Sequence, residues 1–114
     1  MATTRAMIER RRSSRVFIRI PVQLFSNGVD GEPLVTLAEA IAVSRCGALV
    51  RASLEPGLGS RIELLNGISQ ETQEFRVIRV THTKDPGVFE LGLEMLYPAR
   101  KFWGIQFPDE RVPA

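Results

Sequence analysis

The sequence predicts an all-β fold, a small antiparallel barrel or sandwich of roughly six short strands. Apolar and polar residues alternate in several short segments, which is the pattern of half-buried strands. Turn-forming Gly, Pro, Asn and Asp residues separate these segments at spacings of about 8 to 12 residues. The chain has 114 residues, which predicts one domain with a single core.

The first strand is expected where alternation begins, near Arg15. Pro21 lacks an N–H group and therefore predicts that this strand is an edge strand or carries a bulge. Residues 1–12 show no sustained period, so we expect a flexible arginine-rich arm there and a barrel domain over 13–114. The face that alternation assigns to the core comprises Val16, Ile18, Ile20, Val22 and Leu24.

The segment 34–43 fits two different periods, and periodicity alone does not decide between them. The helical stripe would comprise Leu34, Leu37, Ala38 and Ile41, and the strand face Val35, Leu37, Ile41 and Val43. We predict a strand, because the other segments are strand-like and because a tight turn follows at Ser44-Arg45-Cys46-Gly47.

Three later segments are also predicted to be strands. Residues 61–65 place Ile62 and Leu64 inward, and residues 89–95 show the cleanest alternation in the chain. The adjacent apolar pair Val77-Ile78 within residues 74–83 indicates a bulge or burial on both faces. A helical turn is expected to cover apolar surface with the aromatic-rich tail that contains Phe102, Trp103, Ile105 and Phe107.

Charge is distributed unevenly along the chain. The net charge is +2, but residues 1–19 hold six Arg against one Glu, so this stretch carries +5 and the other 95 residues carry −3. Of the 15 basic residues, 13 are Arg. A guanidinium group is planar, stacks on rings and grips phosphate with paired hydrogen bonds. The arginine cluster therefore predicts an anionic partner with flat parts.

The residues that most enzymes need are missing from this sequence. His82 is the only histidine and Cys46 the only cysteine, and neither lies in a nucleophile or zinc motif. No phosphate-cradling glycine motif occurs. We therefore predict that the protein is not an enzyme and needs no metal or cofactor. No apolar run has the length of a membrane span or the form of a signal peptide, which predicts a cytoplasmic protein.

Two local motifs point to a binding site. In Arg11-Arg12-Ser13-Ser14-Arg15, two guanidinium groups four positions apart lie where the arm joins the first strand. In Ser44-Arg45-Cys46-Gly47, a hydroxyl, backbone amides and a Gly that permits positive φ lie together.

In order and spacing, these motifs resemble those of the PilZ family of cyclic di-GMP receptors. That family has RxxxR followed some 30 residues later by [D/N]xSxxG. Arg11 and Arg15 match the first motif, and Ser44 and Gly47 match most of the second, with Ala42 where the family has Asp or Asn. The resemblance implies a six-stranded antiparallel barrel with a short C-terminal helical segment.

The resemblance also implies a ligand and a set of binding residues. Cyclic di-GMP would be held by Arg11, Arg12, Arg15, Ser44, Arg45 and Gly47. The arginines would grip phosphates and the O6/N7 edge of guanine, and ordering of the arm on the ligand would signal to a partner protein. Ala42 cannot accept a hydrogen bond from guanine, a loss of about 1 to 3 kcal/mol, so weak to moderate binding is expected.

Two alternatives remain open at this point. One is a PilZ-like domain that has lost the ligand and acts as a protein-interaction module. A small nucleic-acid-binding barrel would also explain the basic leader. The acidic body weighs against the latter, as does the small number of aromatic residues placed to stack on bases, of which Phe17 and Phe25 are the best candidates.

Overall fold

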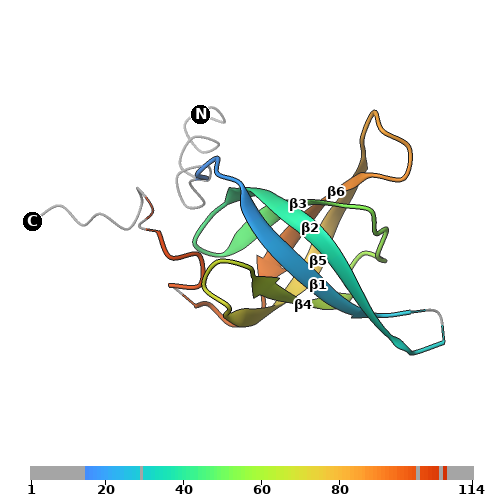
Figure 1. The fold of residues 1–114 in the computed structure, drawn as a ribbon, viewed down its shortest axis with the longest axis horizontal. Helices are drawn as coiled ribbons and strands as arrows, with labels where there is room; N and C mark the ends of the chain where they lie inside the picture. The colour runs from blue at the N-terminus through green and yellow to red at the C-terminus, as the bar shows by residue number, and fades with distance from the viewer. Residues whose placement is uncertain (1–14, 29, 100, 106, 108–114) are drawn as a thin grey trace, which may run out of the picture.

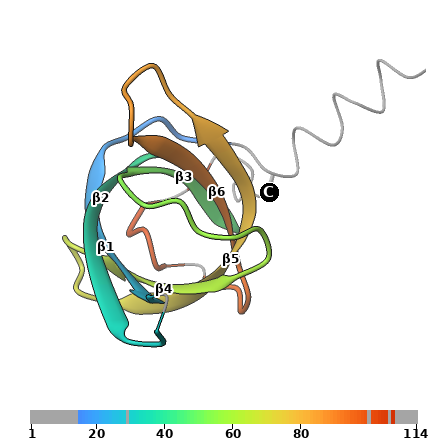
Figure 2. The same ribbon diagram turned by 90° about the vertical axis from the view of Figure 1, so that its right-hand side faces the viewer.

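The computed structural model describes residues 15–28, 30–99, 101–105 and 107. Six strands form a closed antiparallel barrel in the order β1-β2-β3-β6-β5-β4 (Figure 1), and the view turned by 90° shows the ring of strands (Figure 2). The predicted all-β barrel is confirmed, whereas the arm over 1–12 lies outside the described residues. The strands are β1 (Ile20–Asn27), β2 (Pro33–Val43), β3 (Gly47–Ala52), β4 (Arg61–Asn66), β5 (Thr72–His82) and β6 (Phe89–Met95).

Alternation in β1, β4 and β6 places large apolar side chains inside the barrel, as the sequence predicts. Ile20, Val22 and Leu24 of β1 are buried, and Ile62 and Leu64 of β4 meet them in the core. Inward and outward positions alternate along every strand of a closed barrel. The outer surface of each strand is therefore available for a binding site.

The segment 34–43 is a strand, as predicted, but the face assigned to the core is wrong over its first half. Val35 and Leu37 are 56% and 74% exposed, whereas Ala40 is fully buried. Pairing with β1 sets this register, because Ala40 lies opposite the buried Ile20 and paired residues share a face. The small inward side chain of Ala40 faces a large one from β1, as is common in narrow barrels.

The prediction that Pro21 marks an edge strand or a bulge is also wrong. β1 pairs with β2 on one side and with β4 on the other, and its register has no irregularity. The ladder with β4 begins only at Val22, and the Pro21 carbonyl accepts a hydrogen bond from Gly67 N–H beyond the end of β4 (2.7 Å). The missing N–H of Pro21 therefore costs no ladder hydrogen bond.

The aromatic tail covers one end of the barrel without forming a helix in the described residues. Phe102 and Trp103 are buried, and their rings lie 5.8 and 6.3 Å from that of Phe75 in the core. Asn66 Nδ2 donates to the Phe102 carbonyl (2.8 Å), and Gly104 has a positive φ of 74°. The expected helical turn is thus replaced by tight turns fastened to the barrel. No helix able to span a bilayer occurs in the described part of the chain.

Candidate functional site

An open depression lies on the outer surface of the barrel, across β2, β3, β6 and β5. Residues from all four strands, the β2–β3 turn and the entry to β1 form its walls. They are Arg15, Ala42, Val43, Ser44, Cys46, Gly47, Ala48, Leu49, Ile78, Arg79, Gly92, Leu93 and Glu94.

Arg15 reaches this depression because the next residue is tied to the end of β2. Val16 N–H donates to the Val43 carbonyl (2.8 Å), and Val43 N–H donates to the Val16 carbonyl (3.0 Å). This isolated antiparallel bridge brings the second arginine of the RxxxR motif next to Ser44, which lies 29 positions later in the sequence.

The turn from Ser44 to Gly47 forms one wall of the depression. Ser44 N–H donates to the Gly47 carbonyl (2.9 Å), and the Cys46 carbonyl accepts from Met95 N–H of β6 (2.7 Å). Gly47 was expected to supply positive φ, but it is not among the glycines in that conformation. Its role is close approach, because a Cβ atom at Gly47 would overlap the backbone carbonyl oxygen of Leu93.

The floor of the depression is a row of outward-facing residues that runs across four neighbouring strands, with one residue from each strand. Ala42 pairs with Leu49, Leu49 pairs with Gly92, and Gly92 pairs with Arg79. Ala42 faces outward because the register of β2 shifts between Ala40 and Ala42. Ala42 is 1% exposed, and Leu49 and Gly92 are half-buried, so the floor of the depression is low beside the exposed Arg79.

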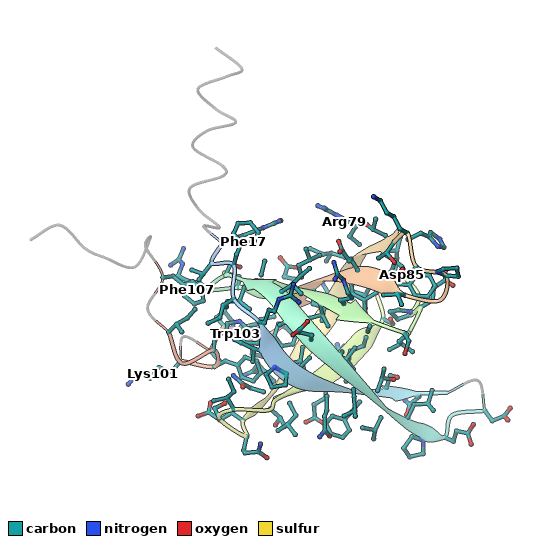
Figure 3. The ribbon with its side chains drawn as sticks, turned by 45° about the horizontal axis from the view of Figure 1, so that its top comes forward. Phe17, Arg79, Asp85, Lys101, Trp103 and Phe107 are labelled. Atoms are coloured by element: carbon teal, nitrogen blue, oxygen red, sulfur yellow. The ribbon has the colours of Figure 1, made fainter. Side chains whose placement is uncertain are left out.

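A second register shift brings Arg79 into the row. The β5–β6 ladder is irregular between Val77 and Arg79, as the Val77-Ile78 pair predicted, and both Ile78 and Arg79 are exposed. A bulge changes the direction in which the following side chains point. Figure 3 shows Arg79 projecting from the barrel surface. Gly92 makes room for it, because a Cβ there would lie 3.1 Å from Arg79 Cβ.

The depression carries charges of both signs. Among the described residues, no carboxylate lies at ion-pair distance from Arg15 or Arg79, and no basic group lies at that distance from Glu94, which is in register with Gly47. The neighbouring row differs, because Arg51 of β3 donates to Glu90 of β6 (2.8 Å). That hydrogen bond raises the pKa of Arg51. Arg15 and Arg79 are thus the two guanidinium groups of the depression open to an anion.

Only some of the predicted site residues come together here. Arg15, Ser44 and Gly47 all line the depression, whereas Arg45 is half-buried in the turn and does not line it. Arg11 and Arg12 lie outside the described residues.

Several lining residues were missed by sequence reasoning. Arg79, Glu94 and Leu49 join the site only through the pairing of β5, β6 and β3, which one strand's sequence does not reveal. Gly92 gave the available signal, since a glycine inside a strand often marks a close approach.

The sequence matches no family model and no curated protein, so comparison with known proteins assigns no family to this domain. Among the residues that the structure describes, no group of His, Cys, Asp and Glu side chains is arranged to hold a metal ion.

Substitution of Gly47 tests the close approach that shapes the turn. We expect Gly47→Ala to lower the free energy of unfolding by about 1 to 3 kcal/mol, because the added methyl must push the Leu93 carbonyl aside. Urea denaturation followed by Trp103 fluorescence measures this change. Gly57→Ala is the matched control, since a Cβ at Gly57 meets no atom within 4 Å. Equal effects of the two substitutions would contradict the assignment.

Proposed function

We propose that this domain binds cyclic di-GMP in the depression between Arg15 and Arg79, and that it acts as a receptor for this messenger. The observation that carries the proposal is the transverse row of Ala42, Leu49, Gly92 and Arg79, with Arg15 beside its other end. The row has an exposed arginine at one end and a second exposed arginine, Arg15, near the other.

The ligand's chemistry fits these features one by one. Cyclic di-GMP has two phosphates and two flat purine rings. A guanine ring in the depression would contact the half-buried Leu49 and Gly92 with its face. Arg15 and Arg79 would donate paired hydrogen bonds to phosphate oxygens or to the O6/N7 edge of guanine, and each can also stack on a ring.

The turn residues and Glu94 supply the remaining polar groups. Ser44 and Gly47 line the depression and could offer a hydroxyl and backbone groups to the ligand. Ala42 offers no acceptor for the N–H groups of guanine, but Glu94 lies in register with Gly47 on the adjacent strand. Its carboxylate accepts hydrogen bonds only, so it suits the donor edge of guanine. Arg11 and Arg12, four and three positions before Arg15, would close over the bound ligand and present a new surface to a partner protein.

The two arginines of the depression provide the first test. We expect Arg15→Ala and Arg79→Ala each to weaken cyclic di-GMP binding by about 10-fold to 100-fold, since each removes charge-assisted hydrogen bonds worth roughly 1.5 to 3 kcal/mol. Isothermal titration calorimetry measures the dissociation constants. Arg61→Ala is the matched control, because it removes an exposed arginine of β4 that does not line the depression.

A second readout uses the single cysteine. Cys46 is exposed and lines the depression, so bound ligand should slow its reaction with a thiol reagent in the wild type. Neither heat nor protection of Cys46 at about 1 mM ligand would refute the receptor proposal. It would favour the ligand-free interaction module instead.

The floor residue Ala42 provides an independent test. We expect Ala42→Asp to tighten binding by about 10-fold, because a carboxylate there would accept hydrogen bonds from guanine N–H groups. Ala42 is only 1% exposed, so the melting temperature of the variant is measured alongside its affinity. Ala42→Asn supplies an acceptor without charge, and Ala42→Val is the control that adds volume alone. Tightening by Val, or weakening by both Asp and Asn in folded protein, would contradict a guanine edge placed beside position 42.

A further inference from the structure

The β1–β2 hairpin extends beyond the rest of the barrel and carries an open strand edge. Figure 1 shows this hairpin projecting from the barrel. β2 pairs with β1 from Pro33 to Ala40, but its ladder with β3 begins only at Glu39. Among the described strands, none pairs with the other side of residues 33–38. We call this side of residues 33–38 the open edge.

The direction of the backbone groups follows from the hairpin's hydrogen bonds. Gly28 N–H donates to the Glu32 carbonyl (2.6 Å), so this pair is a hydrogen-bonded one. Such pairs recur at every second residue of an antiparallel ladder, which turns the N–H and C=O groups of Leu34, Thr36 and Ala38 toward β1. Those of Val35 and Leu37 therefore point to the open edge, where the described residues offer them no partner.

The side chains next to this edge are apolar and exposed. Val35 and Leu37 are 56% and 74% exposed on the outer face, and Val35 lies opposite Phe25 on β1. Residues 33–38 read Pro-Leu-Val-Thr-Leu-Ala and contain no charge. Natural proteins usually protect an exposed edge with lysines, bulges or inward-pointing charges, and this segment has only Pro33 at its start.

We propose that the open edge pairs with the same segment of a second copy of this chain, in an antiparallel two-fold dimer centred on Thr36. This register gives Val35 N–H the carbonyl of the partner's Leu37, and Leu37 N–H the carbonyl of the partner's Val35. It also places Val35 beside the partner's Leu37 on one continuous outer face, where such cross-strand pairs stabilise a sheet.

The neighbouring registers fit less well. Centring the axis on Val35 would oppose Leu37 to the partner's Pro33, which has no N–H to donate to the Leu37 carbonyl. Centring it on Leu37 would oppose Val35 to the partner's Glu39, which already pairs with Arg51 of β3. An odd register would put the outer face of one copy against the inner face of the other. The sequence of the edge is thus complementary to itself in one register, which favours a second copy as the occupant.

Sedimentation velocity over a range of concentrations up to about 1 mM tests this dimer. We expect the wild type to shift from monomer to dimer, and Leu37→Lys to raise the dissociation constant at least about 10-fold, because two-fold symmetry places one lysine from each copy in the interface. Leu58→Lys is the control, since Leu58 is 71% exposed in the loop before β4.

Two further measurements separate the edge from other surfaces. Leu37→Pro removes an N–H that serves no ladder in the monomer, so it should abolish the dimer and leave the fold intact. In the wild type, amide exchange at Val35 and Leu37 should slow as concentration rises. A wild type that stays monomeric would overturn the proposal, even if the open edge binds a different protein. A dimer that both Leu37 variants leave unchanged would also overturn it.

Discussion

The register between β1 and β2 determines which side chains this barrel buries and which surfaces it offers. Ile20 lies opposite Ala40, and Val22 opposite Ala38, so the alanines of β2 face the core and the larger Val35 and Leu37 face solvent. The strand then shifts register after Ala40, which returns Val43 to the core and turns Ala42 toward the outer face, where it is almost fully covered. The candidate site and the open edge are therefore two consequences of how one long strand is paired.

The candidate site depends on backbone pairing more than on contacts between its own side chains. The bridge between Val16 and Val43 brings Arg15 to the β2–β3 turn, and the shift in β5 turns Arg79 outward beside Gly92. Arg79 lies on β5 and Arg15 lies next to the bridged Val16, so the backbone positions both arginines while their side chains stay exposed. In such a site the backbone positions are preorganised, while the ends of the arginine side chains can adjust to the ligand. This suits a ligand that is flat, anionic and larger than one base.

The sequence allows strands to be predicted where one face is large and apolar, as in β4 and β6. The sequence misleads for β2, because a periodicity argument favours Leu and Val over Ala as core residues. The pairing with β1 decides instead which side chains of β2 face the core. The aromatic tail was correctly expected to cover the core, but its turns depend on the hydrogen bond from Asn66, which no local pattern predicts. The motif residues Arg15, Ser44 and Gly47 could be selected from spacing. Arg79 and Glu94 could not, since cross-strand neighbours are set by register.

A titration of nitrogen-15-labelled protein, followed through its amide resonances, shows whether the row from Ala42 to Arg79 is the floor of a cyclic di-GMP site. We expect the amide resonances of Leu49, Gly92 and Arg79 to shift together and saturate with added cyclic di-GMP, while that of Ile62 on β4 does not move. Absence of any shift at about 1 mM ligand, or shifts confined to strands outside the depression, would contradict it.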